Sequence, residues 1–149
     1  MPSSIFEDVS FDAADFRADP DGGGAHGYWT VSEENVRYFR WERTGDVATV
    51  QLSLDQGSTI SGSTSGPPHL YVKLPGDLRA SDRYETTFAY TEHQWAETYS
   101  TDGHLIVFRD DNPPATSYIR LGKLPGTPFD NGTYLGLFFE ARIPLMPEE

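Results

Sequence analysis

The sequence contains no cysteine, and lysine occurs only at Lys73 and Lys123. Without cysteine the chain can form neither a disulfide nor a thiolate metal site, and it has no thiol nucleophile. No apolar run approaches the ~20 residues that a membrane helix needs. Residues 1–10 also lack the basic and apolar regions of a signal peptide. We therefore expect no membrane insertion, and a stability that comes from packing and oligomerisation.

Positive charge is scarce overall. The 149-residue chain has a formal net charge of −12 and a pI of about 4.6. Such a field repels polyanions, so we expect no nucleic-acid partner. An excess of acidic residues with arginine in place of lysine is typical of salt-adapted proteins, although an ordinary acidic surface explains the same composition.

Val47–Leu54 has the clearest pattern in the chain. Its even-numbered residues are apolar or small and its odd-numbered residues are mostly polar, which is the period-two alternation of a half-buried strand. Val36–Trp41 alternates in the same way, and Gly45–Asp46 between them can form a tight turn. We predict an antiparallel hairpin at the centre of the fold, with Leu52 facing the core.

The rest of the chain predicts further short strands and no helix. These strands are Tyr28–Val31, Leu70–Leu74, Tyr84–Thr91, Trp95–Tyr99, His104–Arg109, Ser117–Leu121 and Thr133–Ile143. Ser117–Leu121 is expected at a sheet edge, and Thr133–Ile143 at the centre with Phe139 inward. The spacing predicts an all-β fold, an antiparallel β-sandwich of jelly-roll type, in a single domain over residues 22–149.

The segments between the strands predict turns and loops. Asp102–Gly103 has the composition of a hairpin turn, and Ser32–Asn35 that of a polar turn or a single helical turn capped by Ser32. Gln56–Pro68 is rich in glycine and serine, which predicts a surface loop with at most a short strand around Thr59–Ile60.

Residues 1–21 are expected to form an N-terminal arm or an edge strand. Five apolar residues are spread through this acidic segment: Ile5, Phe6, Val9, Phe11 and Phe16. The Pro- and Gly-rich stretch Asp19–Gly24 separates the arm from the domain. The arm can pack on its own sheet in cis or on a neighbouring subunit in trans, and the sequence leaves both alternatives open.

The residue patterns indicate no catalytic, metal or cofactor site. The histidines, His26, His69, His93 and His104, lie beside expected turns and have no metal-ligand spacing. The run Asp110–Asn112 lacks the spacing of a calcium loop. Glycosidases need paired carboxylates, and the available ones are Glu85, Glu92, Glu97 and Glu140. Strand parity points Glu85 and Glu140 at solvent or a subunit contact, so we expect no enzyme.

Aromatic residues are the enriched class. Most of them, including Trp29, Trp41 and Trp95, are expected to fill a β core. A second set has outward strand parity or lies near loops: Tyr38, Tyr71, Tyr99 and Tyr134. Members of this set can form a sugar-stacking surface or a subunit contact.

Five segments of the sequence carry a resemblance. They are WTV (Trp29–Val31), NVRYFRW (Asn35–Trp41), GDVATVQLSLDQGSTISG (Gly45–Gly62), LYVKLPG (Leu70–Gly76) and NGTYLGLFFEARI (Asn131–Ile143). Together they resemble a domain of tailed phages and related viruses that occurs in tail-fibre tips, head fibres and small virion surface proteins. The resemblance spans about Phe11–Ile143, and the loop Pro113–Phe129 departs from it.

The resemblance implies a trimeric virion structural protein of jelly-roll-like fold. Because only a short arm precedes Gly22, it implies a capsid decoration or spike protein rather than a whole tail fibre, with the major capsid or tail proteins as partners. The alternatives are a tail-associated receptor-binding or adaptor module, with a host surface glycan as partner, and an extracellular carbohydrate-binding module.

Overall fold

The computed structural model describes residues 6–18, 28–61, 69–94, 97–109, 118–123 and 134–147. They form short 3₁₀ helices and ten strands, with no α-helix in these ranges. The strands are β1 (Glu7–Asp8), β2 (Phe16–Arg17), β3 (Tyr28–Thr30), β4 (Val36–Thr44), β5 (Val47–Ser61), β6 (Leu70–Lys73), β7 (Tyr84–Gln94), β8 (Glu97–Val107), β9 (Tyr118–Lys123) and β10 (Tyr134–Pro144). Their pairings are antiparallel, which confirms the predicted all-β antiparallel class.

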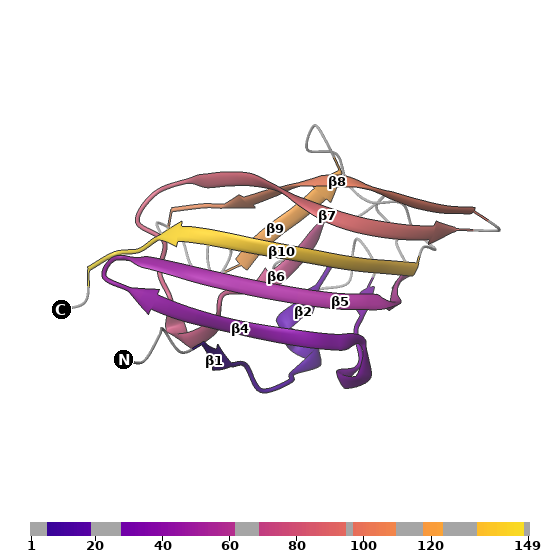
Figure 1. Cartoon of the computed structure of the whole chain (residues 1–149), viewed down its shortest axis with the longest axis horizontal. Coiled ribbons are helices and arrows are strands. Elements are labelled where there is room, and N and C mark those ends of the chain that lie inside the picture. The colour runs from indigo at the N-terminus through magenta and orange to yellow at the C-terminus, as the bar shows by residue number, and fades with distance from the viewer. Residues whose placement is uncertain are drawn as a thin grey trace.

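The strands belong to a single curled sheet. Its order is β1-β4-β5-β10-β7-β8-β9-β6-β2, and β3 pairs with β5 beside this path. Figure 1 shows β4, β5 and β10 side by side in front, with β9, β6 and β2 behind them. The sheet is thus a half-barrel with the core on its enclosed side. A curled antiparallel sheet does not by itself establish a sandwich of jelly-roll type, so that assignment stays a prediction.

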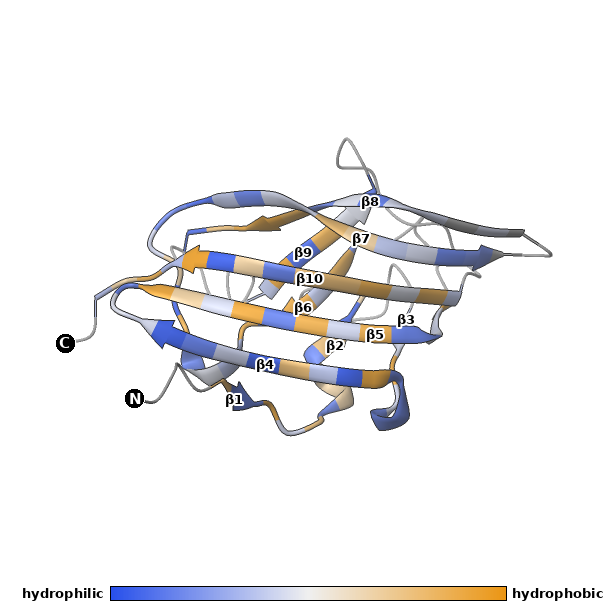
Figure 2. Ribbon diagram, viewed as in Figure 1, coloured by the Kyte–Doolittle hydropathy of each residue, from blue (hydrophilic) through white to orange (hydrophobic). Residues whose placement is uncertain are grey.

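β5 and β10 are the central strands. Leu52 on β5 lies opposite Phe139 of β10 on one side and Phe39 of β4 on the other, and all three are buried. Apolar and polar bands alternate along β5 in Figure 2, as a period of two requires. The predicted inward faces of both strands are confirmed. The predicted turn before β5 is also confirmed, with Gly45 at a φ of +60°.

β5 extends further than predicted, because residues 56–61 continue the strand. Ser61 pairs with Tyr28 of β3, and Thr59 pairs with Tyr134 of β10. Ladder partners on both sides satisfy the backbone of a segment whose glycine and serine content favours a loop. Residues 62–68, the remainder of the predicted loop, lie outside the described residues.

The predicted hairpin turn at Asp102–Gly103 is wrong. β8 runs through both residues and pairs with β7 from Val107 to Glu97, so the chain reverses between residues 94 and 97. A Cβ at Gly103 would lie 2.4 Å from Cε1 of Phe88 on β7. Glycine occurs at this position because the Phe88 ring needs the space.

β9 occupies a different place from the predicted edge strand Ser117–Leu121. It lies inside the sheet, paired with β8 on one side and with β6 on the other. The strands at the ends of the order are β1 and β2, and both come from the N-terminal segment. The local sequence of β9 does not show that the strand has a partner on each side, because one of these partners, β6, lies far away in the chain.

Residues 6–18 of the predicted arm, which we call the clasp, pack on the chain's own sheet. β1 pairs with β4 at one end of the strand order, and β2 pairs with β6 at the other. Phe16 is buried, with its ring centroid 5.5 Å from that of Trp29 and 6.0 Å from that of Phe39. The described part of the arm therefore follows the cis alternative, whereas Ile5 lies outside the described residues.

Candidate functional site

The sheet face turned away from the core exposes aromatic residues of β10. We call it the outer face; it consists of the outward-pointing residues of β4, β5, β10, β7 and β8. Tyr134 and Phe138 point outward and are 51% and 43% exposed, whereas Leu137 and Phe139 are buried. Gly136 lies between the two rings on the same strand face. Residues four apart on a strand are separated by roughly 13 Å, so β10 presents two aromatic side chains on either side of Gly136, which the neighbouring backbone of β5 covers.

Phe138 belongs to a row of residues that crosses the sheet. In the ladder, Ser53 of β5 lies between Tyr38 of β4 and Phe138. The two aromatic rings meet edge to face above the buried Ser53, with centroids 6.4 Å apart and planes at 76°. The row continues through Ala89 of β7 to Asp102 of β8. Small residues at Ser53 and Ala89 leave Phe138 standing above its surroundings.

The adjacent row is a polar ladder. Arg40 Nε donates to Gln51 Oε1 at 2.7 Å, and Gln51 Nε2 donates to Glu140 Oε2 at 2.7 Å. The Arg40 guanidinium also lies over the Tyr38 ring, 4.3 Å from its centroid. These contacts fix the orientation of Tyr38 and, through it, that of the edge-to-face aromatic pair.

On the other side of Phe138 the outer face contains a groove of about 500 Å³, and Gly136 is one of the residues that line it. We call it the outer groove. Its polar walls are formed by Arg37, Asp55, Gln56, Thr91, Ser100 and Asp102, and Phe138 forms one end. A β-bulge in β5 opposite Gly136 shapes the groove, since the β5–β10 register shifts between Leu135 and Leu137.

Two glycines and a capped 3₁₀ turn hold the bulge in place. A Cβ on Gly136 would lie 3.0 Å from the backbone carbon of Asp55, so only glycine fits beneath the bulge without a shift. Asp55 Oδ1 accepts from Gly57 N at 2.8 Å and from Asn35 Nδ2 at 3.2 Å. Asn35 ends the 3₁₀ helix Glu33–Asn35, whose predicted Ser32 cap is confirmed by Ser32 N donating to Asn35 Oδ1 at 2.9 Å.

The candidate carboxylates are not brought together as a pair. Glu85 and Glu140 are exposed on the outer face, as predicted from parity, whereas Glu92 is buried on the inner face. Glu97 lies in β8, but its side chain is outside the described part of the structure. Because Glu92 has the parity of the buried Phe88 and Tyr90, the same alternation rule would have placed it inside.

Glu92 forms an ion pair with Lys123 of β9 in the interior. Lys123 Nζ lies 3.3 Å from Glu92 Oε1, with side chains 24% and 7% exposed. Glu92 Oε2 is buried and has no hydrogen-bond partner among the described residues. A carboxylate at this depth needs its cation, because an unpaired buried charge is costly.

Replacing Lys123 with methionine is expected to lower the free energy of unfolding by about 2 kcal/mol. The value lies below the roughly 3–5 kcal/mol of a fully buried pair because Lys123 is partly solvated. Urea unfolding measures the change. Lys73→Met, at the exposed second lysine, is the matched control. Equal stability of the Lys123→Met single variant and the Glu92→Gln/Lys123→Met double variant would contradict the prediction.

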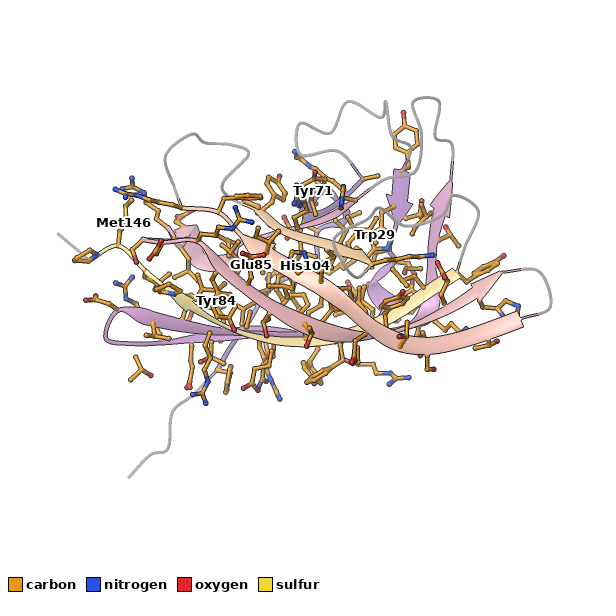
Figure 3. The ribbon with its side chains drawn as sticks, turned by 90° about the horizontal axis from the view of Figure 1, so that it is seen from above. Trp29, Tyr71, Tyr84, Glu85, His104 and Met146 are labelled. Carbon is orange, nitrogen blue, oxygen red and sulfur yellow. The ribbon has the colours of Figure 1, made fainter. Side chains whose placement is uncertain are left out.

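Glu85, His104 and Arg83 form the charged cluster of the outer face, and Figure 3 shows Glu85 and His104 next to each other. Arg83 Nε and His104 Nε2 each lie 2.9 Å from a Glu85 oxygen. Hydrogen bonds from Arg83 and then His104 lower the pKa of the Glu85 carboxyl. Its contribution to stability is therefore present above the unfolded-state pKa and is lost as the pH falls through the lower folded-state pKa.

The histidines are dispersed. His104 lies in the middle of β8, so its predicted position beside a turn is wrong for the same reason as the Asp102–Gly103 turn. His93, near the end of β7, has Nδ1 2.8 Å from Thr98 Oγ1. His69 precedes β6, whereas His26 and the run Asp110–Asn112 lie outside the described residues. Within the described ranges no three His, Asp or Glu side chains are grouped to hold a metal ion.

The predicted aromatic surface is assembled in part. Tyr38 and Tyr134 share the outer face, whereas Tyr71 lies on β6, in the layer behind. The side chain of Tyr99 lies outside the description. Phe138 was not singled out from the sequence, although the parity that buries Phe139 also exposes it.

The tryptophans that the structure describes pack in or against the core. Trp29 is buried, and its Nε1 donates to Ser58 Oγ at 3.1 Å. Trp41 is half-buried and covers Gly76, where a Cβ would lie 2.4 Å from its ring. Trp95 lies outside the described ranges.

Comparisons of the chain with protein-family models, with curated proteins and with solved structures find no match. The described part of the chain contains no helix of the length and apolarity needed to cross a membrane.

Proposed function

We propose that this protein is a structural protein of a virus particle, displayed on the capsid surface as a decoration or spike protein. The observation that supports it is that the segments carrying the virion-protein resemblance all form strands of one sheet, in which β4, β5 and β10 are neighbours and β3 pairs with β5. These segments coincide with β3, β4, β5, β6 and β10. The two facing layers of the curled sheet favour a jelly-roll-like arrangement, and the open outer face offers a contact surface of the kind that a particle protein presents.

A second candidate is a recognition role, either as a tail-associated receptor-binding or adaptor module or as an extracellular carbohydrate-binding module. The outer groove and the exposed Phe138 favour it, because an aromatic ring standing in solvent beside polar walls is typical of a ligand site. A recognition role is compatible with display on a particle, since a surface protein is placed to meet a receptor.

Immunogold labelling tests the particle assignment. Antibodies against the protein are expected to label the capsids of particles released by cells that carry the gene, and the protein is expected to sediment with those particles. Label confined to tails would favour the tail-associated alternative. Protein that remains entirely in the non-particulate fraction, while the major capsid protein sediments, would contradict the proposal.

We expect a homotrimer in solution, with three times the 16.6-kDa mass of one chain. The resemblance implies a trimer, and Tyr28 of β3, which does not line the outer groove, is 60% exposed and leaves an aromatic ring in water in a monomer. Multi-angle light scattering over the micromolar range measures the mass, with and without molar salt to screen the net charge of −12. A monomer at every concentration and salt level would contradict the trimer.

A further inference from the structure

The outer groove combines an aromatic platform with polar side chains that have no partner within the described residues. Arg37, Gln56 and Asp102 line its walls, and their side chains make no hydrogen bond or ion pair with another described residue. Thr91 and Ser100 bond to each other through their hydroxyls at 3.1 Å. Donors and acceptors therefore converge on a hollow that the protein itself does not fill.

We infer that the outer groove binds a neutral oligosaccharide. A sugar ring has an apolar face of C–H groups and a rim of hydroxyls, so it needs a flat aromatic surface together with several donors and acceptors. Phe138 supplies the surface at one end of the groove, and the carboxylate, amide, guanidinium and hydroxyl groups of the walls supply the hydrogen bonds.

The arrangement along β10 indicates a ligand longer than one sugar. Tyr134 and Phe138 stand on the same strand face, roughly 13 Å apart. Gly136 between them is buried beneath the Asp55–Gln56 backbone of the bulge, so the middle of a bound chain would lie over the bulge. The His93 ring lies beside Tyr134 with its centroid 6.4 Å away and supports that second ring. This spacing suits a short oligosaccharide that lies along the strand.

The charge of the walls selects against anionic ligands. Asp55 and Asp102 contribute two carboxylates, whereas Arg37 contributes the single guanidinium of the lining. The formal net charge of −12 adds a repulsive field around the groove. A sialylated, sulfated or phosphorylated glycan would be repelled, whereas the binding of an uncharged polyhydroxylated chain is not weakened by electrostatic repulsion.

The same walls argue against a second copy of the chain as the occupant. The buried centre of a homo-oligomer interface is more apolar than the surrounding surface and is depleted in charge. Here Arg37, Asp55 and Asp102 line the hollow itself, and the polar ladder of Arg40, Gln51 and Glu140 borders Phe138. Covering this surface with protein would bury the charges of Arg37 and Asp102, which have no ion-pair partner among the described residues.

An array of immobilised oligosaccharides tests the inference. It carries neutral hexose and N-acetylhexosamine oligomers beside their sialylated and sulfated counterparts, and calorimetry with the strongest neutral binder gives the affinity. We expect binding to neutral members only. Phe138→Ala is expected to weaken it by about tenfold or more, because the stacking surface is lost, whereas Phe138→Tyr keeps it within a few fold.

Val47→Ala is the matched control, because Val47 is a similarly exposed apolar residue at the far end of the outer face. Its affinity is expected to equal that of the unchanged protein. The inference is overturned by an array without binding at millimolar protein, by a preference for anionic glycans, or by equal losses in Phe138→Ala and Val47→Ala. A Phe138→Ala variant that changes only the oligomeric mass would identify a subunit contact instead. None of these results depends on whether the protein is found on particles.

Discussion

Replacing Phe139 with alanine is expected to lower the free energy of unfolding by about 3–5 kcal/mol, the range for truncating a buried phenylalanine. Phe139 is 1% exposed on the central strand β10, between β5 and the enclosed core. The loss has two parts. The variant no longer gains the free energy of transferring the ring out of water, and the cavity left behind costs further free energy. A central strand paired to a neighbour cannot move inward to fill that cavity, which places the change toward the upper part of the range.

Chemical denaturation of the unchanged protein and of Phe139→Ala measures this difference, and Phe138→Ala is the control on the adjacent residue. Because Phe138 faces solvent, its truncation is expected to cost less than about 1 kcal/mol. Similar losses in the two variants would mean that the inward and outward faces of β10 are assigned wrongly.

Leu52→Ala is expected to cost about 2–5 kcal/mol. Leu52 and Phe139 are cross-strand partners, so their cavities merge in the double variant. The combined loss should therefore differ from the sum of the single losses, as is usual for residues in contact. Strict additivity would indicate that the side chains do not share one packed region.

Deleting residues 1–17 is expected to prevent stable folding. The deletion removes β1 and β2, the strands at the two ends of the sheet order, together with the buried Phe16. It exposes the edges of β4 and β6 and leaves Trp29 and Phe39 without their aromatic neighbour. Far-UV circular dichroism and thermal melting of the truncated chain measure the outcome.

Phe16→Ala provides a milder version, with an expected loss of about 3–5 kcal/mol. Ser10→Ala, at an exposed position of the same segment, is the control and should change the stability by less than about 0.5 kcal/mol. If the truncated chain kept a native melting transition but lost particle binding or oligomerisation, the segment would be an arm that docks in trans.

The strands predicted best from the sequence are those with one buried face and one solvated face, because their apolar and polar residues alternate. Leu52 and Phe139 are buried where parity places them, and the turn at Gly45 follows from local composition. In these elements local pattern and tertiary environment agree, so a short window of sequence is enough.

The errors arise where a distant partner decides the structure. Gly103 has the local signature of a turn, but it is a strand residue that accommodates the Phe88 ring. Residues 56–61 have the composition of a loop, but β3 and β10 supply ladder partners on both sides. Neither partner is visible in a local window of sequence.

The outer groove was only partly predictable. Parity exposes Tyr38, Tyr134 and Phe138, and an exposed aromatic set was expected from it. The hollow itself depends on the β5 bulge opposite Gly136 and on the positions of β7 and β8 beside β10. These are properties of strand order and register, which the sequence alone does not specify for strands this far apart.

The clasp has a consequence for the time course of folding. Its strands can pair only after β4 and β6 exist, and the central pairing of β5 with β10 must wait until residues 134–144 have left the ribosome. The clasp is thus synthesised before either of its partner strands, and it cannot complete its pairing until residues 70–73 are available. Such distant pairing slows folding to milliseconds or seconds. During that interval the apolar N-terminal segment is exposed, which makes the nascent chain a candidate client for a chaperone.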